Sequence, residues 1–159
     1  MTGERERRFM QIAVDLARRG MENGDGGPFG SIVVKGEEII GRGWNQVLLL
    51  NDPTAHAEVM AIRDACKKLQ SFQLQDCEIY TSCEPCPMCL GAIYWARPKR
   101  VYFANTKEDA AAIDFDDSFI YHEIEVPHSA KKIPFIAFPS AAALQVFKDW
   151  KEKGEKRLY

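Results

Sequence analysis

The sequence has 159 residues, of which 46% are hydrophobic and 28% are charged, proportions typical of one globular domain with a sizeable core. Its formal net charge of −2 disfavours a broad nucleic-acid-binding surface. The longest aliphatic run, residues 47–50, is too short to span a bilayer, and the charged N-terminus lacks the apolar segment of a signal peptide. We therefore expect a cytoplasmic protein whose five cysteines are thiols or metal ligands rather than disulfides.

The first half of the chain alternates helical and strand patterns. Apolar residues at helical spacing predict a helix over 4–20. The stretches "SIVVKG" and "EEIIGRGW" predict a hairpin that turns at Gly36. The stretch "NDPT" at 51–54 is typical of a helix start, with Asp52 as the cap, and this helix should run to about Leu69.

The second half continues the alternation. Strand patterns occupy residues 77–82, 100–105 and 133–138. Helices are predicted at 84–96, at 107–112 and at 140–153, the last capped by Ser140, and residues 123–132 are expected to be a surface connection. Strands that alternate with helices indicate an α/β layered domain with a mixed central sheet, which we expect to span residues 1–159.

Two short motifs point to a metal site. The motif "HAE" places His56 and Glu58 at one predicted helix start, and "PCPMC" places Cys86 and Cys89 at another. Residues three apart share a helix face, so both sulfurs can reach one ion, and a helix N-terminus favours thiolates. If the two helices start side by side, one histidine and two cysteines converge. Three such ligands with an open fourth position describe a catalytic zinc site.

In such a site Glu58 can transfer protons, which it could not do as a metal ligand. A carboxylate two residues after His56 can take the proton of a water at the metal and return it to the substrate. His-x-Glu followed by Pro-Cys-x-x-Cys is the zinc-deaminase pattern. The rival interpretations are a structural zinc with four ligands and, because Cys83 extends the motif to Cys-x-x-Cys-x-x-Cys, an iron–sulfur cluster. The fourth cysteine of an iron–sulfur run is absent, and Cys83 is interpreted as a buried apolar residue.

Four stretches together resemble the bacterial cytidine-deaminase-like guanine deaminases: "GGPFG", "NDPTAHAEVMAIR", "YTSCEPCPMCLGAIYWARPK" and "FDDSFIY". The resemblance runs nearly end to end and includes the C-terminal tyrosine. It implies a three-layer α/β/α fold, one Zn²⁺ per subunit and the hydrolytic deamination of guanine to xanthine and ammonia. It also implies a homodimer in which C-terminal segments are exchanged, so that each terminal tyrosine helps to close the partner's active site.

The resemblance also assigns residues around the purine base. It implies that Phe29 packs on the ring, that Trp95 forms another wall and that Asn45 offers an amide to the purine edge. Asp117 would bind the amino edge and shuttle a proton alongside Glu58. The full set of implied substrate contacts is Phe29, Asn45, Ala57, Trp95, Asp117 and Tyr159. Without the resemblance, Trp95 would be interpreted as a core aromatic and Asn45 as a turn former. For Phe29 the sequence alone supports a core aromatic and a substrate contact about equally.

Three other functions fit the same motifs. The first is deamination of guanosine or of another nucleoside or aminated heterocycle. The second is tRNA adenosine deamination, which requires a basic face, whereas the basic runs at 5–8 and 151–157 are mixed with acidic residues. The third is a non-catalytic, zinc-stabilised interaction module, which would have no use for Glu58.

Overall fold

The computed structural model describes residues 3–159. The chain divides into two compact units, a first that ends at Asp117 and a second over Ser118–Tyr159. The first unit contains the whole sheet and both predicted metal-binding motifs. No helix within residues 3–159 is both long enough and apolar enough to cross a membrane.

The sheet of the first unit is mixed, as predicted. Its spatial order is β2-β1-β3-β4, with β1 antiparallel to both β2 and β3, and with β3 parallel to β4. The predicted hairpin turn at Gly36 is confirmed by its left-handed φ of 61°. The four strands are β1 (Gly30–Lys35), β2 (Glu38–Trp44), β3 (Cys77–Cys83) and β4 (Arg100–Asn105).

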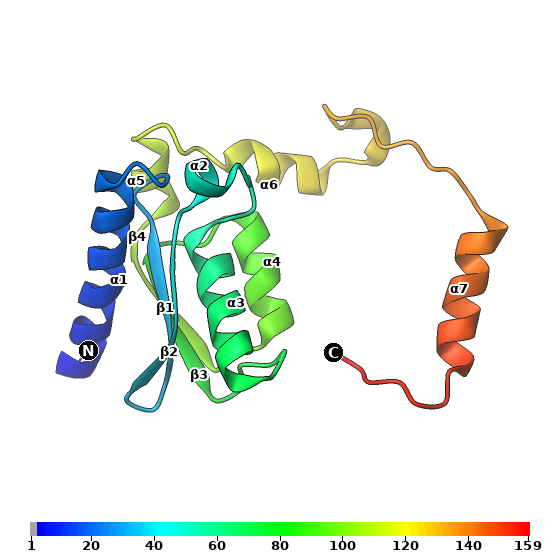
Figure 1. Ribbon diagram of the computed structural model, residues 1–159. Coiled ribbons are helices and arrows are strands. Elements are labelled where there is room, and N and C mark those ends of the chain that lie inside the picture. The colour runs from blue at the N-terminus through cyan, green and yellow to red at the C-terminus, as the bar shows by residue number, and fades with distance from the viewer. Residues whose placement is uncertain (1–2) are drawn as a thin grey trace. The chain divides into compact units, whose positions relative to one another are not determined.

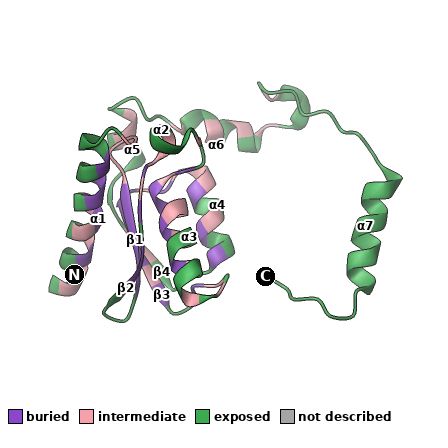
Figure 2. Cartoon of the chain, in the orientation of Figure 1, coloured by how far each residue is buried: buried purple, intermediate pink, exposed green. Residues whose placement is uncertain are grey.

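One face of the sheet is covered by the first helix, α1 (Glu4–Glu22). Its apolar stripe, predicted from the 3.6-residue spacing, is the side that is buried (Figures 1 and 2). Alternate side chains of β1 and β3 point toward it, because successive residues of a strand face opposite sides. The buried cluster on this face consists of Phe9, Leu16, Ile32, Val34 and Tyr80.

The other face is covered by α3 (Ala57–Leu69) and α4 (Pro87–Ala96), which gives three layers, α/β/α (Figure 1). The helix α3 approaches β2 so closely that a Cβ added at Gly43 would lie 2.1 Å from the carbonyl oxygen of Ala57. Glycine at this position therefore sets where the first turn of α3 rests on the sheet. The cluster buried here includes Val33, Ile40, Ala61, Ala65, Leu74, Ile79 and Ile93.

Short helices complete both units. The first unit also contains α2 (Val47–Leu50), which the sequence did not predict, and α5 (Lys107–Ala111), which it did. The second unit consists of α6 (Ser118–Glu125), η1 (His128–Ala130) and α7 (Ala141–Glu152). The cap predicted at Ser140 is confirmed, because its hydroxyl accepts a hydrogen bond of 3.2 Å from the backbone N–H of Ala143. The segment 123–132 is mostly exposed, as predicted for a surface connection, and it includes the end of α6 and all of η1.

The strand predicted at 133–138 is wrong. These residues are exposed and irregular, and no strand among residues 3–159 pairs with them. An apolar, β-rich stretch becomes a strand only when a neighbour accepts its hydrogen bonds, and Pro134 removes one donor. The residue types of a segment indicate that it could form a strand, but they do not show whether a neighbouring strand is available to pair with it.

Candidate metal centre

Two helix starts carry the predicted metal ligands. His56 is the N-cap of α3 and Cys86 is the N-cap of α4, and both have extended backbone conformations. The predicted helix start at 51–54 is wrong, because Asp52 caps a separate turn in which Oδ1 accepts hydrogen bonds from the N–H and hydroxyl of Thr54. The helix predicted from residue 84 begins at Pro87. This proline therefore takes the first helical position, where proline is best tolerated.

The ligand atoms have the spacing that zinc requires. The Nδ1 atom of His56 lies 3.5 Å from the Sγ of Cys86 and 3.6 Å from the Sγ of Cys89, and all three atoms lie within 4.8 Å of one another. Tetrahedral zinc with Zn–S of about 2.3 Å and Zn–N of about 2.0 Å would place N and S about 3.5 Å apart. The donor set and its spacing therefore fit Zn²⁺ held by one imidazole and two thiolates.

One of the two ligand thiols is held as a thiolate, the form that binds a metal ion. The hydrogen bond with Cys89, together with His56, lowers the pKa of the Cys86 thiol well below its usual range. The same Cys86–Cys89 hydrogen bond and burial raise the pKa of Cys89, so the two sulfurs share a proton. A hydrogen bond to Cys86 raises the pKa of His56. A bound cation would displace these protons, as metal sites built from thiols require.

The cluster has three ligands among the described residues, and Cys83 is not one of them. Cys83 is buried, its Sγ donates to the carbonyl oxygen of Thr106 at 3.6 Å, and burial raises its pKa to about 11. These contacts agree with its interpretation as a buried apolar residue. Three ligands correspond to an open catalytic site rather than to a closed structural one.

Glu58 lies in the first turn of α3, beside the three ligands, and is 7% exposed. Its Oε1 accepts a hydrogen bond of 3.2 Å from the hydroxyl of Thr81 on β3. Burial raises the pKa of Glu58, which brings a carboxyl group toward the range where it can both accept and donate a proton near neutral pH.

The loop before β1 and the end of β2 meet beside the start of α3. Phe29 and Phe115 make an edge-to-face contact with ring centroids 4.9 Å apart. Asn45 is 5% exposed, and the next residue, Gln46, donates its backbone N–H to the carbonyl of Ala55, which directly precedes His56. The structure thus brings Phe29 and Asn45 to the same end of the sheet as the metal ligands.

The other predicted contacts are distributed as follows. Asp117 is half-buried, and burial together with the charge of Cys86 raises its pKa, so it lies within electrostatic reach of the ligands. Ala57 is fully buried behind His56, and Trp95 on α4 is 65% exposed. Tyr159 ends the second unit and is also exposed.

Sequence reasoning missed two residues that shape this site, Thr81 and Gly26. Thr81 is the hydrogen-bond donor to Glu58, and strand alternation in "CEIYTS" does place it on the face that packs on α3. Gly26 lies against Asn45, where an added Cβ would be 2.1 Å from Oδ1 and 2.7 Å from the backbone oxygen. No sequence pattern signals that contact, because it joins a loop to a strand end.

We expect Gly26→Ala to raise KM for the substrate by about tenfold, the equivalent of roughly one lost hydrogen bond. The new methyl group would displace the Asn45 amide, whose Oδ1 otherwise accepts from the N–H of Val47 at 3.1 Å. Steady-state kinetics measure this effect. Gly91→Ala is the matched control, because an added Cβ there meets nothing within 4 Å, and an equal rise in KM for both variants would contradict the role of Gly26.

Comparison with known proteins gives one family. Residues 3–105 match the cytidine and deoxycytidylate deaminase zinc-binding region. A guanine deaminase of Bacillus subtilis is 54% identical over 151 residues, which cover 95% of this chain and 97% of that protein. A tRNA-specific adenosine deaminase of Aquifex aeolicus is 33% identical over 146 residues, 91% of this chain and 93% of that protein.

Comparison with solved structures agrees with the sequence comparison. The X-ray structure of guanine deaminase from Bacillus subtilis matches with a TM-score of 0.94 at 53% identity, covering 100% of this chain and 99% of that one. A structure of guanine deaminase from Nitrosomonas europaea matches with a TM-score of 0.65 at 31% identity, covering 74% of this chain and 66% of that one. The α/β/α fold expected from the sequence is thereby confirmed.

Proposed function

This chain belongs to the cytidine and deoxycytidylate deaminase family of zinc-dependent enzymes, and we propose that it hydrolyses guanine to xanthine and ammonia, a step of purine catabolism or salvage. The observation that carries the choice of substrate is 54% identity to a guanine deaminase over 95% of the chain. The metal motif alone would not decide, since tRNA-specific adenosine deaminases also match this chain.

His56, Cys86 and Cys89 would hold one Zn²⁺ per subunit, as the spacing of their ligand atoms supports. When bound, zinc is a Lewis acid that lowers the pKa of water to about 7 and so supplies a nucleophile at neutral pH. The pair of helix N-termini that carries His56 and Cys86 would favour the anionic ligands and the developing negative charge.

Glu58 would be the general acid and base. It would take a proton from the attacking water and deliver it to ring N3, so that negative charge does not accumulate as the C2 carbon becomes tetrahedral. A second proton must reach the exocyclic nitrogen before ammonia leaves, and either Glu58 or Asp117 would supply it. The raised pKa values of both carboxyl groups support this assignment.

The purine would lie between aromatic and polar side chains. Phe29, held edge-to-face by Phe115, would pack on the ring, and Trp95 would form a second wall. The Asn45 amide and the Asp117 carboxylate would hydrogen bond the purine edge, beside the backbone of Ala57. Tyr159 would close the pocket from a partner subunit.

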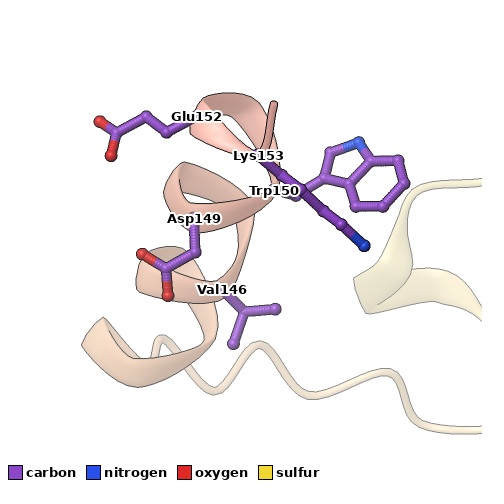
Figure 3. Close-up of a pocket in the computed structure, with 5 residues that line it drawn as sticks. All are labelled: Val146, Asp149, Trp150, Glu152 and Lys153. Atoms are coloured by element: carbon purple, nitrogen blue, oxygen red, sulfur yellow. The ribbon is translucent and has the colours of Figure 1, made fainter. Parts of the chain in front are cut away.

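The second unit supports a homodimer with exchanged C-terminal segments. Every residue of α7 is exposed. An open hollow on this helix is lined by Val146, Asp149, Trp150 and Glu152, together with the next residue, Lys153 (Figure 3). An amphipathic helix with an uncovered apolar side requires another surface. We propose that a second copy of the chain provides it.

The exchange predicts complementation between two inactive variants. We expect a Glu58→Gln protein and a protein lacking Tyr159 to recover guanine turnover when mixed under conditions that allow subunit exchange. The mixed dimer would contain one site with an intact Glu58 and the partner's terminal tyrosine. Mixing each variant with itself is the control, and no recovery in verified heterodimers would place Tyr159 outside the partner's site.

The structure disfavours a tRNA substrate. The basic N-terminal run forms ion pairs, because Arg5 and Arg8 lie 2.7 Å and 2.5 Å from the carboxylate oxygens of Glu37. Binding of a polyanion normally requires a basic face and weakens steeply with salt. Salt-dependent tRNA binding by this protein would revive the alternative.

We also propose that the protein works in the cytoplasm. None of the five cysteines is in a disulfide, and two of them must remain reduced to bind zinc. A reducing compartment provides that condition.

The proposed function is tested by ammonia release from guanine, with guanosine, adenine, cytosine and cytidine assayed in parallel, before and after zinc removal. Guanine turnover that disappears with the metal and returns with added zinc supports the proposal. Zinc-dependent turnover of guanosine would show that the pocket accepts a ribose. No turnover of any compound by fully zinc-loaded protein would contradict the proposal and favour tRNA or a non-catalytic role.

A further inference from the structure

Thr81 connects the sheet to the proposed general base. It lies in β3, is 1% exposed, and donates its hydroxyl to Oε1 of Glu58 at 3.2 Å. Glu58 is itself 7% exposed, so the bond joins two buried groups. A hydrogen bond to a buried carboxylate is stronger and more costly to lose than one at the surface.

The position of Thr81 is fixed from both sides. Its backbone pairs with Ser31 of β1 in the antiparallel ladder and with Phe103 of β4 in the parallel one. Interior strands held by two neighbours are among the most rigid parts of a fold. The same strand leads directly to Cys86, which follows Thr81 by five residues. One strand therefore carries both the donor to Glu58 and the connection to the thiol ligands.

This arrangement selects one oxygen of the carboxylate. The Thr81 hydroxyl occupies Oε1. The other side-chain partner of this carboxyl group is the thiol of Cys89, which would give up its proton to a bound cation. With that thiol deprotonated, Oε2 is the atom left to exchange a proton with water and substrate. General acid–base catalysis requires the working atom to be within hydrogen-bond reach of the proton that it transfers. The terminal torsion angle of a glutamate, χ3, normally has a broad distribution. A hydrogen bond to one carboxylate oxygen restricts rotation about this torsion.

We propose that Thr81 is a positioning residue that anchors Oε1 of Glu58 and thereby reserves Oε2 for proton transfer. The inference rests on the proposed function of Glu58 as the general base. Thr81 is not expected to touch the substrate or the metal, so its loss should affect the chemical step rather than binding.

Ser31 offers a matched control. It is the cross-strand neighbour of Thr81, it is fully buried, and its hydroxyl makes no hydrogen bond. Ser31→Ala thus removes a buried hydroxyl from the same face of the sheet without touching Glu58. Removal of an unsatisfied hydroxyl should leave stability unchanged or increase it.

The experiment compares Thr81→Val, Thr81→Ser and Ser31→Ala with the unmodified protein. We expect Thr81→Val to lower kcat for guanine by about tenfold to a hundredfold, the scale of a misplaced catalytic group. KM and bound zinc per chain should stay the same. Thr81→Ser should restore kcat to within about threefold, because the hydroxyl returns. Ser31→Ala should not change kcat.

Two further measurements keep the inference testable if valine disturbs folding. In a Glu58→Gln background, Thr81→Val should cause no additional loss, because the group that it positions no longer transfers protons. A crystal structure of zinc-loaded Thr81→Val should show the Glu58 carboxylate rotated. An unchanged kcat for Thr81→Val, or an equal loss in Ser31→Ala, would overturn the inference. Failure of the unmodified protein to deaminate guanine would instead overturn the proposed function.

Discussion

Replacement of Glu58 by Gln is expected to lower kcat for guanine by about 10²–10⁴-fold while the protein retains its zinc. The amide has nearly the same shape and can still accept the hydrogen bond from Thr81, so the fold and the ligand geometry should persist. It cannot take a proton from water, so only the transfer steps are lost. Steady-state kinetics measure the fall in kcat, and zinc analysis of the same preparation measures the zinc that is retained.

Two companion variants sharpen the result. Glu38→Gln makes the same chemical change in an exposed ion pair with Lys68, and such pairs contribute little to stability, so its activity should match the unmodified protein. Asp117→Asn tests the second proton, because a loss comparable to that of Glu58→Gln would give Asp117 an equal share. Full turnover by Glu58→Gln would remove Glu58 from the mechanism.

The metal centre could be predicted from the sequence because its signals are local. His56 and Cys86 each stand at a helix start, and spacing along the chain fixes how Glu58 and Cys89 follow them. The remaining step, that the two helices start side by side, is provided by the sheet. Both β2 and β3 pair antiparallel with β1, so their C-terminal ends lie at the same edge of the sheet. From that edge α3 and α4 pack on the same face.

The pocket around the metal could not be predicted in the same way, because its contacts join segments distant in sequence. The role of Gly26 depends on the Asn45 atoms that a side chain at position 26 would meet. The role of Thr81 depends on the carboxylate of Glu58, 23 residues away in the sequence. The strand predicted at 133–138 shows the converse limit. Its residues have strand composition, but pairing depends on a neighbour that the pattern does not identify.

Replacement of His56 by Ala is expected to abolish zinc binding and guanine turnover together. His56 supplies one of three protein ligands, and its Nδ1 lies within 3.6 Å of both sulfurs. Even residues that only orient a metal ligand cost about 10–100-fold in affinity when removed, so loss of the ligand itself should exceed that. Zinc per chain after dialysis and ammonia release from guanine are the measurements.

The matched control is Cys83→Ala, which removes a buried thiol close in sequence to Cys86 that donates its hydrogen bond to the carbonyl of Thr106. It should retain one zinc per chain and most of its activity, with a modest loss of stability from the small cavity. A His56→Ala protein that keeps stoichiometric zinc would overturn the ligand set. Loss of zinc from Cys83→Ala would contradict the three-ligand site, because it would make Cys83 a fourth ligand. The centre would then be a closed structural one.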